Sequence, residues 1–115
     1  MSNAPSVALH RKRWALSQIE LAHLLGVSQA NISRIEDPNT AKSAKLEAIL
    51  ALQVVFGRAP RTLFTALFAA IEDAVIRRAA ELDATLRDKH DPESMKKKQL
   101  LIVMLKRVSS NSRST

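Results

Sequence analysis

The 115-residue sequence has no cysteine and no tyrosine, only two glycines, and only 3% aromatic residues. The lack of cysteine excludes a disulfide framework, a thiolate metal site and a cysteine nucleophile. The scarcity of glycine, together with abundant alanine and leucine, favours helices over strands. No apolar run is long enough to span a bilayer, and no basic segment followed by an apolar one marks a signal peptide. We therefore expect an all-α, cytoplasmic protein without membrane contact.

Residues capable of catalysis are present but are not arranged for it. The three histidines, His10, His23 and His90, are isolated and lack the spacing of metal ligands. The serines lack a paired base, and the chain has no glycine-rich phosphate-binding loop. The sequence therefore predicts a protein that is not an enzyme and that binds no metal or cofactor.

The composition is strongly basic. Lysine and arginine number 18 against 11 acidic residues, which gives a formal net charge of +7 and a pI near 10.4. Such a balance suits a polyanionic partner such as nucleic acid. The cations are spread along the chain, and those at residues 96–98 occupy different faces of a helix. We interpret these three lysines first as solubilising residues and second as a contact to flanking DNA.

Helical periodicity and capping residues divide the chain into six expected helices. Ser17 and Glu20 have the spacing of a capping box, and Gly26 can end that helix in the left-handed conformation. Trp14 is expected in the core rather than as an exposed stacking platform. In the fourth helix one apolar face contains Leu46, Ile49, Leu50 and Val54. The predicted helices span about residues 6–14, 17–25, 28–36, 43–56, 60–88 and 91–108.

The second and third helices are joined by almost no loop, in the segment SQIELAHLLGVSQANISRIE. On a helical wheel Ile32 and Ile35 of the third helix point inward, and short polar residues with one arginine point outward. Glutamine and arginine side chains have the forked geometry that matches adenine and guanine edges in the major groove. An ordinary helical hairpin is the alternative interpretation.

The segment LSQIELAHLLGVSQANISRIE resembles the helix-turn-helix of the phage repressor/Cro-like (XRE) family of DNA-binding regulators. The resemblance extends over about residues 6–68, because AKLEAILALQVVFGRAPRTLF resembles the fourth and fifth helices of that family. Members have five helices, bind duplex DNA and usually act as dimers on two-fold operators. The packing positions that match are Leu21, Ala22, Leu25, Gly26, Val27, Ile32 and Ile35.

The resemblance implies a role for individual residues. Arg11 and Glu36 match a pair that ties the first helix to the third in some members. The family often has a glycine soon after the third helix, where this chain has Glu-Asp-Pro-Asn-Thr at residues 36–40, so the following loop can take another path. Arg34 could also contact phosphate or solvent, and Ala30 could contact a thymine methyl or simply be small. The residues expected to face DNA bases are Gln29, Ala30, Ser33 and Arg34; those expected to face the DNA backbone are Gln18, Ser28, Asn31, Thr40, Lys42, Ser43 and Lys45.

The predicted helix 60–88 is too long to be covered by a five-helix core, and its apolar residues recur at steps of three and four. Its far half must pack on the last helix or on another chain. We expect a homodimer interface built from both helices, and packing within one chain is the alternative. The expected interface residues are Phe68, Ile71, Val75, Leu82, Leu86, Leu101, Met104 and Leu105.

The sequence thus predicts a five-helix repressor-like domain at 1–68, a helical dimerisation extension at 69–108 and a disordered tail at 109–115. The expected function is that of a transcriptional regulator, a repressor, which binds a two-fold symmetric double-stranded DNA operator as a homodimer. The alternative is an antitoxin or adaptor whose C-terminal helices bind a protein partner and whose DNA binding is autoregulatory.

Overall fold

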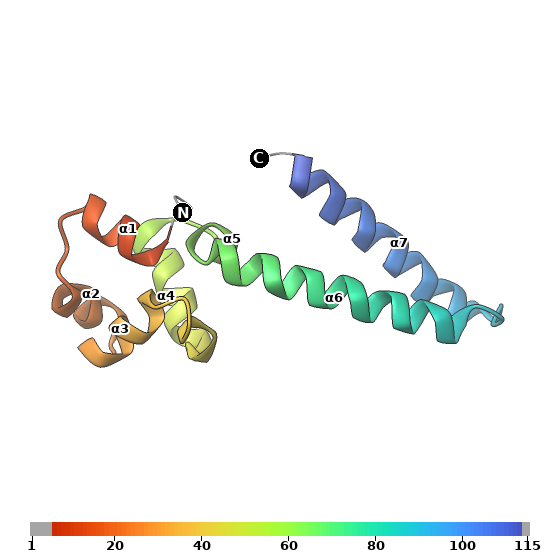
Figure 1. The fold of residues 1–115 in the computed structure, drawn as a ribbon, viewed down its shortest axis with the longest axis horizontal. Helices are drawn as coiled ribbons and strands as arrows, with labels where there is room; N and C mark the ends of the chain where they lie inside the picture. The colour runs from red at the N-terminus through yellow and green to blue at the C-terminus, as the bar shows by residue number, and fades with distance from the viewer. Residues whose placement is uncertain (1–5, 114–115) are drawn as a thin grey trace. The chain divides into compact units, whose positions relative to one another are not determined.

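The computed structural model describes residues 6–113, and within this range every regular element is a helix, apart from one isolated backbone bridge (Figure 1). The all-α prediction is confirmed for these residues. The chain divides into two compact units between Ala69 and Ala70. The elements are α1 (Val7–Arg13), α2 (Gln18–Leu25), α3 (Gln29–Glu36), the short 3-10 helix η1 (Ala41–Ser43), α4 (Leu46–Phe56), α5 (Pro60–Leu63), α6 (Thr65–Leu86) and α7 (Pro92–Arg113).

Local capping groups set several of these helix ends, as the sequence predicts. The Ser17 hydroxyl accepts the Glu20 N–H at 3.0 Å, and the Glu20 carboxylate accepts the Ser17 N–H at 2.8 Å. Gly26 and Gly57 end α2 and α4 in the left-handed conformation, with φ of 71° and 65°. A side chain at either position would strain the backbone, because L residues rarely adopt this conformation.

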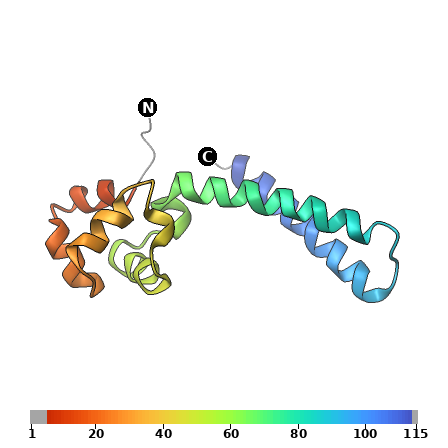
Figure 2. The same ribbon diagram turned by 60° about the horizontal axis from the view of Figure 1, so that its bottom comes forward.

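The first unit packs five α-helices around a single core (Figure 2). Each helix from α1 to α5 contributes one of the five largest side chains that are fully buried in this core. Ile35 and the small Ala22 and Ala48 complete the buried cluster. The five large buried side chains are Val7, Leu21, Ile32, Leu52 and Leu63.

The predicted long fifth helix is wrong at its start, because the helix breaks at Phe64. This residue has φ of −125° and ψ of 53°, and it forms an isolated antiparallel bridge with Ser6. Leu63, one residue earlier, is fully buried in the core. These contacts with distant parts of the chain override the local helical preference, so α5 is a single turn and α6 begins anew at Thr65.

The prediction of which face of α4 is apolar and buried is also wrong. Leu46, Leu50 and Val54 are 68%, 52% and 85% exposed, whereas Ala48 and Leu52 are buried. The helix carries apolar residues on all sides, so periodicity alone could not identify the side that faces the core.

The expectation for Trp14 is wrong as well. Its side chain is 69% exposed, at the end of α1. The following residue, Ala15, adopts a left-handed φ of 58°, so the chain leaves the helix axis immediately after the tryptophan.

The second unit is a helical hairpin made of α7 and the part of α6 that follows Ala69, and the two helices converge at their connecting turn (Figure 1). Hydrogen bonds secure the turn. The Ser94 hydroxyl donates to the Asp91 carboxylate at 2.7 Å, and the Lys98 ammonium donates to the Lys89 carbonyl at 2.6 Å. Its buried side chains are Ala79, Leu86, Ser94 and Leu101.

The last helix is longer than predicted, since α7 continues to Arg113 rather than stopping at Val108. The expectation of a disordered tail is therefore wrong for residues 109–113, and residues 114–115 lie outside the described range. The polar sequence Ser-Ser-Asn-Ser contains neither glycine nor proline. Extension of an existing helix over such residues costs far less than starting a new one.

The hairpin leaves much of its apolar surface uncovered. Residues 100–105 read Leu-Leu-Ile-Val-Met-Leu and are apolar on every side of α7, so a single neighbouring helix cannot cover them. Within the described residues, no helix is long and apolar enough to cross a membrane. The large exposed apolar residues of this unit are Ile71, Val75, Leu82, Met95, Leu100, Ile102, Val103 and Leu105.

Candidate nucleic-acid interface

The two helices α2 and α3 are joined by a three-residue turn, Gly26-Val27-Ser28. The Val27 N–H donates to the Ala22 carbonyl at 3.0 Å, which closes the turn onto α2. Ser28 then caps α3 through its side chain, which accepts the Asn31 N–H. The turn therefore fixes where α3 begins and in which direction it leaves α2.

Helix α3 has one buried and one exposed side, as the sequence predicts. Ile32 and Ile35 are buried against the core. All four residues expected to face DNA bases, Gln29, Ala30, Ser33 and Arg34, are exposed. We refer to these four residues as the outer face of α3.

One side of the outer face is bordered by an ion pair that connects α1 to α3. The Arg11 Nε donates to Glu36 at 2.6 Å, and a second guanidinium nitrogen donates to the same carboxylate at 3.2 Å. The two side chains are only 11% and 8% exposed. Hydrogen bonding to Glu36 raises the pKa of Arg11 above its ordinary value. The pair expected from the family resemblance is therefore present, and a third bond from Arg11 to the Leu16 carbonyl, at 2.8 Å, holds the α1–α2 connection.

Gln18 extends this ion pair to the outer face. Its amide nitrogen donates to Glu36 at 3.0 Å, and its amide oxygen accepts from Gln29 at 3.3 Å and from the Ser33 hydroxyl at 3.4 Å. Gln18 therefore orients two residues of the outer face. Sequence reasoning assigned Gln18 to the DNA backbone and missed these bonds, because its partners lie up to 18 positions away in the chain.

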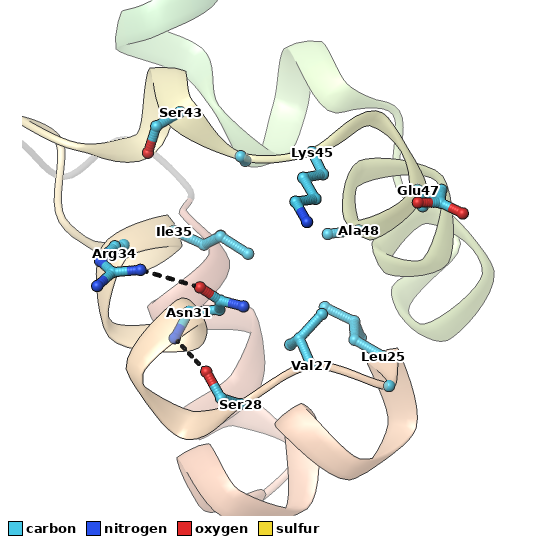
Figure 3. Close-up of a pocket in the computed structure, with 12 residues that line it drawn as sticks. Leu25, Val27, Ser28, Asn31, Arg34, Ile35, Ser43, Lys45, Glu47 and Ala48 are labelled. Carbon is cyan, nitrogen blue, oxygen red and sulfur yellow. Dashed lines mark hydrogen bonds between the residues drawn. The ribbon is translucent and has the colours of Figure 1, made fainter.

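The other side of the outer face is bordered by an open pocket of about 640 Å³ between α3 and the start of α4 (Figure 3). The Lys45 ammonium and the Asn31 amide nitrogen point into this pocket (Figure 3). Its floor is apolar, with Val27 and Ile35 among the contributors. The lining residues are Leu25, Gly26, Val27, Ser28, Asn31, Arg34, Ile35, Ser43, Ala44, Lys45, Glu47 and Ala48.

The side chains expected to face the DNA backbone differ in their capacity to donate hydrogen bonds. The hydroxyls of Thr40 and Ser43 already donate to the carbonyls of Arg34 and Thr40, both at 2.7 Å. These two hydroxyls hold the loop after α3 rather than offering protons to a ligand. The Ser28 hydroxyl instead accepts a backbone N–H, so its own proton remains available.

The loop after α3 turns without the glycine that is frequent in the resembling family. The Asp37 carboxylate accepts the Asn39 N–H at 2.9 Å, and the Asp37 carbonyl accepts the N–H groups of Thr40 and Ala41. The chain then forms η1 and begins α4 only at Leu46, three residues later than predicted. This path leaves the side chains of Lys42 and Lys45 exposed.

Arg34 joins the outer face to the pocket. One of its guanidinium nitrogens donates to the Asn31 amide oxygen at 3.1 Å. This bond turns the Asn31 amide nitrogen toward the pocket. It uses one of the five guanidinium N–H groups of Arg34, so most of these groups take no part in the bond.

No group of three or more histidine, aspartate or glutamate residues within residues 6–113 is placed to hold a metal ion. His10 is buried, and its Nδ1 lies 2.8 Å from the Ser6 carbonyl, which makes it part of the α1 packing.

Comparison of the chain with protein-family models, with curated proteins and with solved structures found no match. The likeness to the repressor/Cro-like family therefore rests on the residues of this chain alone.

Proposed function

We propose that this protein is a sequence-specific double-stranded DNA-binding transcriptional regulator, a repressor, that acts as a homodimer with α3 in the major groove. The observation that carries the proposal is the layout of α3. Its exposed, hydrogen-bonding outer face lies between the Gln18–Glu36 group on one side and the pocket with Lys45 on the other. A major groove is about 12 Å wide, admits one helix, and is bordered by a phosphate strand on each side.

The outer face offers suitable groups for base edges. Gln29 uses one amide N–H to reach Gln18, which leaves its second N–H and its oxygen for a paired contact with adenine. Arg34 has free guanidinium N–H groups for a paired contact with guanine. Ala30 is small enough for a thymine methyl to approach. The Ser33 hydroxyl donates its proton to Gln18, so its oxygen is left to accept from a base amino group.

The flanking groups suit phosphates. Lys42 and Lys45 supply cations, and Ser28 and Asn31 supply neutral donors on the pocket side. Gln18 holds Gln29 through its side chain, so its phosphate contact in this proposal comes from the free backbone N–H groups at the start of α2.

The dimer is supported by the uncovered apolar surface of the hairpin. Four of the expected interface residues in the hairpin, Ile71, Val75, Leu82 and Leu105, are exposed, and Met104 is half-buried. Phe68 is half-buried and belongs to the first unit. Leu86 and Leu101 are buried within the chain and stabilise the hairpin instead.

A fluorescence anisotropy titration with a duplex selected by this protein tests the proposal. Arg34→Ala should weaken binding to the selected duplex by about 1–3 kcal/mol and leave binding to a scrambled duplex almost unchanged. The matched control Lys45→Ala should weaken binding to both duplexes equally and reduce the dependence of log K on log[salt] by about one phosphate contact. Equal losses on both duplexes for Arg34→Ala would refute base reading by this residue.

A second candidate function, that of an antitoxin or adaptor, is favoured by one observation. Helix α7 exposes Leu100, Ile102, Val103 and Leu105, a surface that a different protein could cover. Co-purification of this chain with a second protein in fixed stoichiometry, and loss of that protein on Val103→Lys, would favour this candidate over a homodimer.

A further inference from the structure

We propose that the hairpin associates with a second copy of this chain in a crossed arrangement, in which α6 of one copy packs on α7 of the other. The inference rests on the homodimer of the proposed function and specifies which surfaces meet. The crossed arrangement makes a four-helix assembly in which each helix has two neighbours rather than one.

The first argument is the shape of the apolar surface on α7. Residues 100–105 are all apolar, yet only Leu101 is buried by the chain itself. The side chains of Leu100 and Ile102 leave the helix about 160° apart, since successive residues turn by about 100°. Two sides of α7 therefore need cover, and the hairpin supplies one neighbour.

The second argument is the width of the apolar surface on α6. Ile71, Val75 and Leu82 fall within an arc of about 40° on the helix, and the buried Ala79 and Leu86 lie beside them within a further arc of about 40°. The buried pair belongs to the hairpin contact. The three exposed residues form an adjoining strip that a second helix could cover.

The third argument is charge, and it selects the crossed arrangement over the pairing of like helices. Helix α6 contains four carboxylates and two arginines. Helix α7 contains one glutamate and six lysines and arginines, including Lys96, Lys97 and Lys98. Contact between two copies of α7 would bring these cations together, whereas contact of α7 with the acidic α6 places opposite charges side by side.

The extent of the exposed surface fits a second copy. A stable interface buries about 800 Å² on each partner. The hairpin exposes eight large apolar side chains on two helices, and the exposed strip on α4 has three. The hairpin thus carries eight of the fifteen large exposed apolar side chains of residues 6–113, all on two helices.

Disulfide trapping tests the arrangement directly, because the native chain has no cysteine. Full-length Val75→Cys and Val103→Cys proteins, each with a tag of different size, are mixed and oxidised without DNA. The crossed arrangement predicts that the mixed 75–103 cross-link forms in several-fold higher yield than the 75–75 or 103–103 cross-links. Ala80→Cys, on the opposite side of α6, is the matched control and should cross-link poorly with Val103→Cys.

A predominant 103–103 cross-link would overturn the crossed arrangement in favour of like pairing. If the wild-type protein sediments as a monomer, a second copy does not cover the apolar surface of the hairpin. This holds whether the monomer then binds anionic vesicles or a different protein. Neither outcome depends on DNA, so failure here is distinguishable from failure of the base-reading role of α3.

Charge reversal provides the second measurement. Lys96→Glu/Lys97→Glu should weaken self-association by about tenfold through loss of opposite-charge contacts, and Lys98 is left in place because its ammonium bonds the turn. Mixing this variant with Glu81→Lys/Asp83→Lys should restore association above that of either variant alone. Absence of this rescue, with both variants folded by circular dichroism, would contradict contact between α6 and α7 of different copies.

Discussion

The two units of this chain differ in how completely they bury their apolar residues, although the first unit also exposes seven large ones. In the first unit five large side chains from five helices are at most 2% exposed, and hydrogen-bonding residues gather on the outer face of α3. In the second unit Leu86 and Leu101 are buried, but eight large apolar side chains are exposed. The first unit thus completes its core within one chain, whereas the second has an apolar surface suited to association. The proposed function assigns recognition to the first unit and assembly to the second.

The polar contacts differ in the same way. The ion pair of Arg11 and Glu36 joins residues 25 positions apart and continues through Gln18 to the outer face. In the second unit the hydrogen bonds of Asp91 with Ser94 and of Lys98 with Lys89 are local to the turn. The first unit is therefore specified by contacts between distant segments, and the hairpin by its turn and its apolar surface.

The largest effect should come from the core of the first unit. Leu52→Ala should lower the free energy of unfolding by about 2–5 kcal/mol, because it removes a fully buried side chain and leaves a cavity. The matched control Leu50→Ala, at a 52% exposed position of the same helix, should change it by less than about 0.5 kcal/mol. Urea unfolding followed by circular dichroism measures both. Similar losses for the two variants would mean that both sides of α4 are covered.

The next effect concerns association through the hairpin. Val103→Lys should raise the dimer dissociation constant by about 30-fold, or about 2 kcal/mol, because it places a charge in the apolar interface. Sedimentation equilibrium measures the change, and Gln53→Lys, an exposed polar position on α4 of the first unit, is the control. If Val103→Lys associates like the wild-type protein, residues 100–105 of α7 do not take part in assembly.

A smaller effect is expected at the ion pair. Glu36→Gln should lower the free energy of unfolding by about 1–3 kcal/mol, since it replaces charge-assisted hydrogen bonds to Arg11 with neutral ones. Glu47→Gln, an exposed carboxylate on α4, should be nearly neutral. The Arg11 Nε–H signal in NMR spectra should also shift in the first variant only. An unchanged signal and unchanged stability would show that the Arg11–Glu36 ion pair does not stabilise the first unit.

The smallest effect is a pH dependence at the start of α7. Hydrogen bonds from the Ser94 hydroxyl and N–H lower the pKa of Asp91 below its ordinary value of 3.8. Because the pKa of Asp91 is lower in the folded than in the unfolded protein, its ionised carboxylate stabilises the folded protein. This stabilisation is complete above about pH 3.8 and is lost as the pH falls through the lowered pKa.

The amide signal of Ser94 should report this loss in an acid titration. Asp91→Asn should abolish the transition, whereas Asp88→Asn, in the same connection, should retain it. A Ser94 titration that is identical in the wild-type protein and in Asp91→Asn would contradict stabilisation by the hydrogen bonds between Asp91 and Ser94.

The features predicted from the sequence are those that neighbouring residues determine. The capping box of Ser17 and Glu20, the glycine that ends α2 and the buried pair Ile32 and Ile35 each depend on spacings of a few positions. The Arg11–Glu36 pair connects distant segments, and it was predicted only because the family resemblance supplied it.

The features that were missed depend on distant contacts. The helix break at Phe64 follows from its bridge to Ser6, which no local pattern shows. The buried side of α4 is set by the shape of the core, because that helix is apolar all round. The bonds of Gln18 to Gln29 and Ser33 arise from the angle between α2 and α3, which three-dimensional packing determines.

Selection of bound sequences from random duplex DNA tests the central claim most directly. The account predicts enrichment of one two-fold symmetric sequence, with half-sites separated by one helical turn, about 34 Å. Enrichment should be lost with Arg34→Ala, and the symmetry should be lost with Val103→Lys, so that each unit is tested through its own property. Recovery of no preferred sequence by the wild-type protein would contradict the claim that α3 reads DNA.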